Sequence, residues 1–239
     1  MNKVGIIVPF YNHWDLCHAR LFEFYRLLPQ EEVEIILIDD ASEDIEEIQG
    51  GISWWQKDTK HHKIRYYRTP ENCGFGGAMN IGAKIAMRNG AEILIFHSND
   101  VKIFGDVVTP VLDTINKNEN VLIGNELINY PAGWNEFELQ EKKILIPWLN
   151  GYWLACSSKI WKMLGGFDPI YGKHDYEDVD ISTKALIIGL TLVPLNSPLI
   201  KHLGTQTIGY TAERLAMTTK NREKYLQKWS DKLLEICGK

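Results

Sequence analysis

The hydrophobic positions of the first hundred residues predict strands that alternate with helices. Short apolar runs, the pattern of strands buried on both faces of a sheet, occupy residues 4–8, 33–38 and 93–96, and a further strand is expected at 64–67. Residues 14–28 carry apolar side chains at helical spacing, and a glycine-rich stretch at 71–80 leads into a second helix that ends near residue 87. Strands and helices that alternate across short links predict a mostly parallel sheet with right-handed crossovers.

The pattern of the second half is less regular. We expect helices at 107–116, 159–164, 177–188 and 212–236, and strands at 121–123, at 145–157 and up to residue 193. The polar and aromatic stretch 129–140 is expected to be a mobile loop. Along the last helix, one apolar stripe is expected to dock on the sheet, with a dimer interface as the alternative: Tyr225, Leu226, Trp229, Leu233 and Ile236. No repeat or linker divides the chain, so we expect one domain over 1–239.

Composition narrows the class of protein. The chain has 239 residues, of which 45% are hydrophobic and 24% charged, as in ordinary globular proteins. The formal net charge of −5 argues against a general nucleic-acid binder. Four widely spaced cysteines (Cys17, Cys73, Cys156 and Cys237) lack the spacing of a zinc or redox motif, which favours reduced thiols in the cytoplasm. No apolar run approaches the ~20 residues of a membrane-spanning helix.

Polar groups follow three of the predicted strands. They are found at residues 9–12, at Asp39-Asp40 and at Asn99-Asp100. Because the carboxyl ends of parallel strands lie side by side, these groups are expected to converge on one crevice. Carboxylate oxygens suit Mg²⁺ or Mn²⁺, although a strand-end aspartate is as often a turn or cap residue. The first half is therefore expected to be a nucleotide-binding α/β unit.

The glycine-rich stretch 71–80 has two interpretations. Three glycines before a helix resemble a phosphate cradle, but the dinucleotide fingerprint and the P-loop lysine are both missing from it. Glycines that permit close packing explain the stretch equally well.

A second carboxylate cluster, Glu177, Asp178 and Asp180, lies at the start of a predicted helix, where the helix dipole favours negative charge. Helix-end electrostatics is sufficient to explain Asp180. Glu177 and Asp178 are also what a general base needs, because one carboxylate can accept a proton while the other orients it.

The order of these segments resembles that of the inverting family-2 glycosyltransferases with the GT-A fold, particularly their rhamnosyltransferase-like branch. The likeness covers nearly the whole chain. It is carried by residues 6–12, by Asp39-Asp40-Ala41-Ser42, by the loop 71–80, by Ser98-Asn99-Asp100, by Gly166-Phe167-Asp168 with Glu177-Asp178-Val179-Asp180, by Lys201-His202 with Gly204, and by Asn221-Arg222 with Lys228-Trp229. It implies a mostly parallel, Rossmann-like sheet flanked by helices, a smaller acceptor-side β/loop region and a C-terminal helix. Residues 1–103 would bind the nucleotide and 104–239 the acceptor.

The resemblance also implies roles for individual residues. The nucleotide would contact Pro9, Tyr11, Asn12, Asp39, Asp40, Asn72, Gly76, Asn80, Asn99 and Asp100. Asp100 and His202 would bind Mn²⁺ or Mg²⁺, and Asp178 would deprotonate the acceptor hydroxyl beside Glu177. Only the last carboxylate of the family's Asp-x-Asp step is present, so metal and donor are expected to bind together. His97, just before this step, has no role assigned by the resemblance.

Aromatic side chains pack well against sugars, so Trp134 and Trp153 are candidate acceptor residues, with packing as the alternative. The implied activity is metal-dependent, inverting transfer of a hexose or deoxyhexose from a UDP- or dTDP-type donor to a glycan or lipid-linked glycan. The expected setting is cytoplasmic, peripheral to a membrane assembly, with a homodimer as an option. Two alternatives remain open. A sugar nucleotidyltransferase would need a glycine-rich basic loop after the first strand, and a silent nucleotide-sugar or carbohydrate-binding module would not need Glu177-Asp178.

Overall fold

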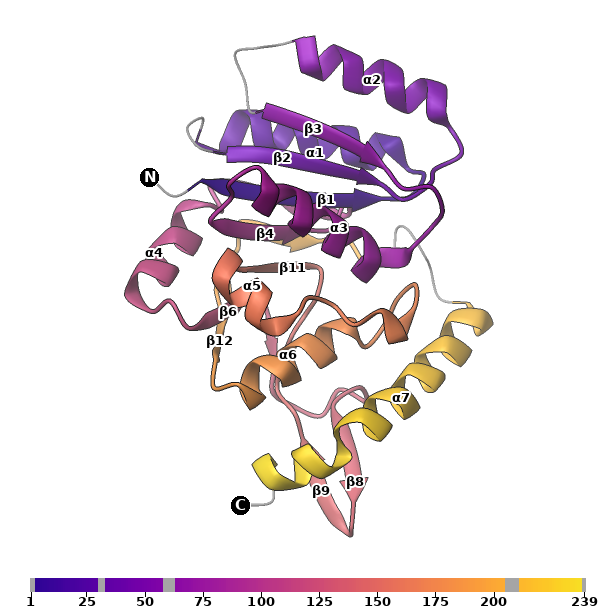
Figure 1. Cartoon of the computed structure of the whole chain (residues 1–239), viewed down its shortest axis with the longest axis vertical. Helices are drawn as coiled ribbons and strands as arrows, with labels where there is room; N and C mark the ends of the chain where they lie inside the picture. The colour runs from indigo at the N-terminus through magenta and orange to yellow at the C-terminus, as the bar shows by residue number, and fades with distance from the viewer. Residues whose placement is uncertain (1–2, 30–32, 58–62, 205–210, 238–239) are drawn as a thin grey trace.

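The computed structural model describes residues 3–29, 33–57, 63–204 and 211–237. Its centre is a seven-stranded sheet with the order β12-β6-β11-β4-β1-β2-β3. The strands are β1 (Val4–Phe10), β2 (Val33–Asp39), β3 (Lys63–Arg68), β4 (Ile93–His97), β6 (Val121–Gly124), β11 (Trp153–Ser157) and β12 (Thr191–Pro194). Only β11 is antiparallel to its neighbours. The predicted mostly parallel α/β sheet is therefore confirmed (Figure 1).

Helices cover both faces of this sheet because the strand side chains alternate between two apolar clusters. One cluster joins Val4, Ile6 and Val8 to α1 (Trp14–Leu27), α2 (Ile45–Lys57) and α4 (Thr109–Lys117). The other joins Ile7 and Ile36 to α3 (Gly74–Arg88), α5 (Ser158–Leu164) and α6 (Glu177–Ile187). Burial of this apolar surface on both sides is the main force that holds the layers together.

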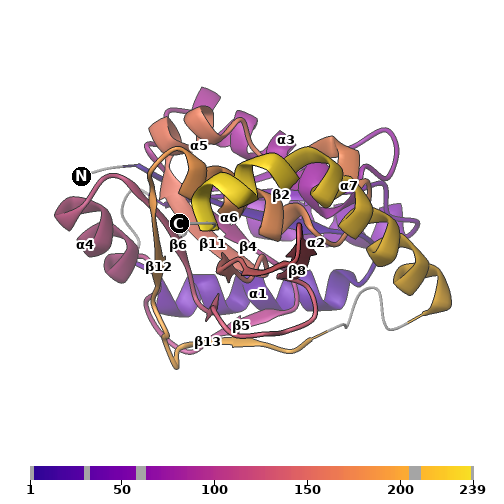
Figure 2. The same ribbon diagram turned by 90° about the horizontal axis from the view of Figure 1, so that it is seen from below.

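Three short two-stranded sheets accompany the central one. They pair β5 (Val101–Ile103) with β13 (Ile200–His202), β7 (Leu127–Ile128) with β10 (Trp148–Leu149), and β8 (Glu136–Leu139) with β9 (Lys142–Leu145). The β5–β13 pair lies beside α1 (Figure 2). The pairing places His202, near the end of the chain, directly opposite Val101.

Two predicted segments differ from the structure. The stretch 145–157, expected as one strand, is divided by a turn at 150–152 into β10 and β11. The stretch 129–140, expected as a mobile loop, contains β8, because Phe137 alternates with two glutamates and is buried under α7 (Ala212–Cys237). In both cases pairing with a distant strand or helix decides the local conformation.

The apolar stripe of α7 is buried, but not on the central sheet. Tyr225 and Leu233 belong to a third cluster, formed with the β8–β9 hairpin, α6 and a 3-10 turn (Pro169–Tyr171), while Leu226 and Trp229 pack at its edge. The prediction that α7 docks on the central sheet is therefore wrong, because α7 packs on the β8–β9 hairpin and α6 instead (Figure 1). The side chain of Ile236 lies outside the described residues. Among the described helices, none has both the length and the apolar character needed to cross a membrane.

Candidate active site

The carboxyl ends of β1, β2 and β4 open onto a cleft of about 430 Å³, here called the donor-side cleft. It is lined by Pro9, Phe10, Tyr11, Asp40, Asn72, Gly74, Phe75, Ala78, Ser98, Asn99, Asp100, Lys173, His174, His202 and Arg214. Six of the ten predicted nucleotide residues lie in this wall: Pro9, Tyr11, Asp40, Asn72, Asn99 and Asp100. Their contact with a ligand stays a prediction.

The polar groups of Asn12, Asp39 and Asn80 are engaged by protein instead. Asn12 Oδ1 accepts the Glu43 amide at 2.8 Å, and Asn80 binds both the amide and the carbonyl of Phe167 at 2.9 and 2.8 Å. Gly76 provides space, since a Cβ there would lie 3.1 Å from the Cβ of Phe167. The side chain of Asn80 and the lack of one at Gly76 therefore hold α3 against the 166–168 turn, and their contact with a nucleotide stays a prediction.

Asp39 is fully buried. Its carboxylate accepts hydrogen bonds from Tyr66 and Arg68, both at 2.6 Å, and from the Ser42 amide. Burial alone would raise the pKa of Asp39, but these donors outweigh it and hold the pKa below the usual range. The ionised carboxylate of Asp39 thus stabilises the loop after β2. To contact a nucleobase, it would have to give up hydrogen bonds to Ser42, Tyr66 or Arg68.

Asp40 explains the glycine-rich stretch. Its carboxylate accepts the amides of Cys73 and Gly74 at 2.8 and 2.9 Å, which caps the start of α3. Because an anion already occupies these amides, the helix start is not a phosphate cradle. Gly74 has a φ of +76° and packs against the backbone of Lys173, so close approach is the reason for glycine here.

Asp100 and His202 meet at the donor-side cleft. Asp100 Oδ2 lies 3.2 Å from His202 Nε2, while Oδ1 accepts the Ser98 hydroxyl at 2.6 Å, and the His202 ring stacks on Tyr152. Burial would raise the pKa of Asp100, yet the hydrogen bonds from His202 and Ser98 outweigh it and lower the pKa. The carboxylate is therefore charged.

This pair suits a divalent metal. An imidazole and a carboxylate are ordinary ligands of Mn²⁺, and two atoms 3.2 Å apart can both reach one ion. Among the described residues there is no cluster of three or more His, Cys, Asp or Glu side chains that could hold a metal. A metal at Asp100 and His202 would therefore need further ligands, and joint binding of metal and donor stays a prediction.

His97 supports the same turn from behind. It is fully buried, its Nε2 donates to the carbonyl of Val101 at 3.0 Å, and its ring meets the edge of Phe24. Burial lowers the pKa of His97 to about 3, so the ring is neutral. Its role is to hold the turn that presents Asp100.

A second cleft of about 400 Å³, the acceptor-side cleft, adjoins the first. The two share Phe75, Ser98, His174, His202 and Arg214, and the acceptor-side cleft adds Glu177 and Asp178. Asp178 Oδ2 accepts the amide of Gly151 at 3.0 Å, from the turn between β10 and β11, and Oδ1 accepts the Val179 amide at 2.8 Å. The structure therefore places the predicted base in a cleft that adjoins the one lined by the predicted metal pair, and His202 lines both clefts.

The environments of the two adjacent carboxylates differ. Burial and the charge of Asp178 raise the pKa of Glu177 well above its usual value, and Glu177 Oε2 is buried without a hydrogen-bond partner. Burial also raises the pKa of Asp178, but the amides of Gly151 and Val179 oppose it. Burial thus raises the pKa of both carboxylates, and Asp178 is the one whose two oxygens accept backbone amides and are oriented by them.

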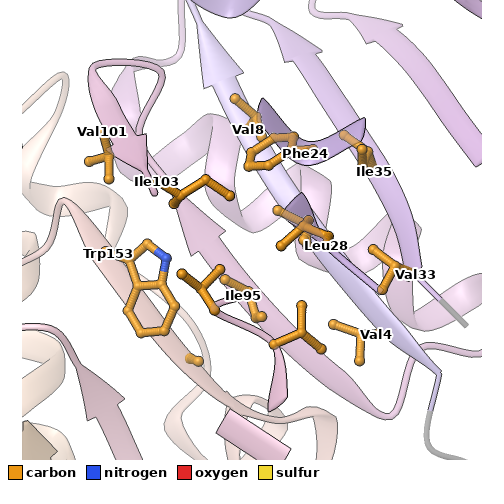
Figure 3. Close-up of a cluster of buried hydrophobic side chains, with 14 of the residues drawn as sticks. Val4, Val8, Phe24, Leu28, Val33, Ile35, Ile95, Val101, Ile103 and Trp153 are labelled. Atoms are coloured by element: carbon orange, nitrogen blue, oxygen red, sulfur yellow. The ribbon is translucent and has the colours of Figure 1, made fainter. Parts of the chain in front are cut away.

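The predicted acceptor tryptophans have different positions. Trp134 lines the acceptor-side cleft, whereas Trp153 is fully buried in the core beside Ile95 (Figure 3). Trp153 cannot contact an acceptor, so that prediction is wrong. Trp148 and Tyr152 line the cleft in its place, and His174, Asp175 and Arg214 were missed because no local motif marks them.

Comparison with known proteins agrees with this geometry. The model of the glycosyl transferase family 2 matches residues 5–168, and this chain belongs to that family. A curated relative, the "Uncharacterized glycosyltransferase YfnE" of Bacillus subtilis (strain 168), is 28% identical over 122 residues, which are 51% of this chain and 29% of that protein.

Solved structures show the same GT-A fold at low identity. They include GalNAc-T7 with UDP, GalNAc and Mn²⁺ (TM-score 0.74, 16% identity, covering 98% of this chain and 49% of that one). The mannosyltransferase PcManGT from Pyrobaculum calidifontis with GDP-Man and Mn²⁺ matches with a TM-score of 0.69 and 19% identity, covering 95% of this chain and 63% of that one. S. aureus TarS 1–349 with UDP-GlcNAc matches with a TM-score of 0.62 and 18% identity, covering 94% of this chain and 66% of that one. The chain thus spans less than a third of the curated relative and about half to two thirds of these structures.

Proposed function

We propose that this protein transfers a sugar, with inversion, from a nucleoside diphosphate sugar of the UDP or dTDP type to a hydroxyl of a glycan or lipid-linked glycan. The observation that carries the proposal is the junction of the two clefts: Asp100 lines the first, Asp178 lines the second, and His202, which contacts Asp100, lines both. The solved neighbours with UDP or GDP-Man and Mn²⁺ support a nucleotide-sugar donor and a divalent metal. The loop 71–80 supports the rhamnosyltransferase-like branch, and hence a deoxyhexose among the candidate sugars.

The mechanism follows from the carboxylates. Asp178 accepts the proton of the acceptor hydroxyl as that oxygen attacks the anomeric carbon, and the bond from this carbon to the nucleoside diphosphate breaks on the opposite face. General-base help of this kind is typically worth ~10²–10⁴-fold in rate. Asp100 and His202 would hold Mn²⁺ or Mg²⁺, which when bound supplies positive charge to the departing diphosphate. Trp134, Trp148 and Tyr152 would pack against the acceptor sugar.

The setting is part of the proposal. We infer one GT-A domain, with residues 1–103 as the nucleotide-binding half and 104–239 as the acceptor-binding half, although Lys173, His174, His202 and Arg214 also line the donor-side cleft. Cys17, Cys73 and Cys156 are free thiols, which supports a cytoplasmic location, peripheral to a membrane where polysaccharide is made. A homodimer stays a prediction.

The substitution Asp178→Asn tests the proposal. The amide oxygen of asparagine can still accept the Gly151 amide, so the side chain should keep its position. Donor binding should be unchanged because residue 178 does not line the donor-side cleft. The side chain of the variant, however, cannot take up a proton. We expect release of nucleoside diphosphate from a panel of UDP-, dTDP- and GDP-sugars to fall by ~10²–10⁴-fold. Asp113→Asn, at an exposed position on α4, is the matched control and should retain full activity. Normal turnover by Asp178→Asn would overturn the role of Asp178 as the base, whereas a wild-type protein that binds donor without turnover would favour a silent binding module.

A further inference from the structure

The two residues before the catalytic pair have an unusual backbone. Asp175 and Tyr176 have φ values of 70° and 77°, in the left-handed region that favours glycine. Two consecutive L residues keep such a conformation only where their surroundings impose it. Since α6 begins at the next residue, whatever imposes it also directs Glu177 and Asp178 into the cleft.

Helix α7 supplies these surroundings. Arg214 makes a bidentate contact with the Asp175 carboxylate at 2.9 and 3.2 Å, and the Thr218 hydroxyl lies 2.6 Å from the same carboxylate. Asn221 is fully buried, and its Nδ2 lies 2.8, 2.9 and 3.0 Å from the carbonyl oxygens of Tyr171, His174 and Asp175. The spacing of 214, 218 and 221 places all three on one face of the helix.

We propose that Asp175 is a positioning residue, which the α7 clamp (Arg214, Thr218 and Asn221) holds so that the backbone entering α6 aims the Asp178 carboxylate at the junction of the two clefts. The inference rests on the proposed function for the role of Asp178. On this inference, helix α7 supplies no general base itself but fixes the position of the one on α6.

The charge of Asp175 provides a test of the proposal, because a residue that only supported the backbone would not change the pKa of Asp178. Burial opposes ionisation of Asp175, but hydrogen bonds from His174, Arg214 and Thr218 hold its pKa well below the usual range. The negative charge of Asp175 in turn raises the pKa of both Glu177 and Asp178. The other charged or titratable groups of the acceptor-side cleft are His174, Tyr176, Arg214, Tyr152 and His202. Removal of the Asp175 charge should therefore lower the pKa of Asp178.

Two threonines on α7 provide a matched pair of variants. Thr218 Oγ1 contacts Asp175 and the Arg214 carbonyl, whereas Thr219 Oγ1 contacts only the Leu215 carbonyl and is exposed. Thr218→Val should raise hydrogen exchange of a peptide spanning 171–182 by roughly tenfold and lower kcat about 3–10-fold with the donor KM unchanged. Thr219→Val should change neither quantity.

Asp175→Asn tests the charge, because asparagine tolerates the left-handed backbone. We expect the plateau kcat to fall by roughly 10–100-fold, and the acid limb of the pH–rate profile to move to lower pH, since Asp178 would lose a negative neighbour. Equal effects of the two threonine changes, or an acid limb that does not move, would overturn the proposal. If the wild type releases no nucleoside diphosphate from any donor, the proposed function fails, and hydrogen exchange still decides whether the clamp exists.

Discussion

Gly151 shows how one residue without a side chain can determine where a catalytic group lies. Its amide donates to Asp178, and a Cβ added to it would lie 2.8 Å from the Asp178 Cβ, closer than such atoms approach in proteins. His97 acts similarly for Asp100, as a neutral ring that holds the carbonyl of Val101. In both cases a carboxylate of the proposed site is held in place by a neighbour that brings no charged group of its own.

Gly151→Ala is expected to displace Asp178 and to lower kcat by about 10²-fold, because a misplacement of about 1 Å is enough to cost that much. Donor binding should be retained, since Gly151 lies only in the acceptor-side cleft. Gly50→Ala on α2 is the matched control, because a Cβ there meets nothing within 4 Å. Steady-state kinetics of both variants check the prediction, and wild-type kcat in Gly151→Ala would contradict the role of Asp178.

Single residues were the hardest level to predict from the sequence. Trp153 and Tyr152 are neighbours in the chain, but side chains alternate between faces, so one lies in the core and the other in the cleft. A one-residue shift in the assumed register would exchange them. The Asp175–Arg214 pair joins residues 39 positions apart, and no local pattern indicates such contacts.

Among the elements, α7 depends most on one buried charge. Asp180 accepts hydrogen bonds from Tyr171, Lys228 and Trp229 at 2.9, 2.7 and 2.7 Å, and Lys184 lies 3.1 Å away. The role expected for Asp180 was helix-end electrostatics. In the structure it also binds side chains of the 3-10 turn and of α7. It joins α6 to α7, together with the buried contact of 2.6 Å between the hydroxyls of Thr183 and Tyr225.

Asp180→Ala would leave the ammonium groups of Lys184 and Lys228 without their buried partner. We expect a loss of about 3–5 kcal/mol in the free energy of unfolding, the usual cost of removing one member of a buried ion pair. Asp231→Ala, at an exposed position on the same helix, should change the free energy by less than ~0.5 kcal/mol. Urea denaturation measures both, and a loss below ~1 kcal/mol for Asp180→Ala would show that this buried charge contributes little to the docking of α7.

The strands β1, β2 and β4 were predictable because each is a short, mostly apolar run, and length distinguishes such runs from helices. The β8–β9 hairpin was not, since its two short strands are stabilised by burial of Phe137 under Tyr225, on an element 88 residues further along the chain. The amphipathic stripe of α7 predicted burial correctly. It could not indicate which surface would cover it.

At the scale of the whole molecule, the donor-side cleft unites distant parts of the chain. Tyr11 and Asn72 come from the first half, whereas Lys173, His202 and Arg214 come from the second. A ligand that fills this cleft binds only the folded state and should stabilise the whole protein by mass action. We expect this stabilisation to depend on metal, because in the proposed site the ion held by Asp100 and His202 also binds the diphosphate of the ligand.

The most direct test of this account is therefore a thermal-shift panel of UDP, dTDP, GDP and ADP, each with Mn²⁺ and with EDTA. One nucleotide, at about 100 times its Kd, should raise the Tm by roughly 5–10 °C, and only with Mn²⁺. Asp100→Ala should lose this shift, while Asp178→Asn should keep it. A shift of equal size in EDTA, or its survival in Asp100→Ala, would contradict the metal-linked donor site on which the proposed transfer reaction depends.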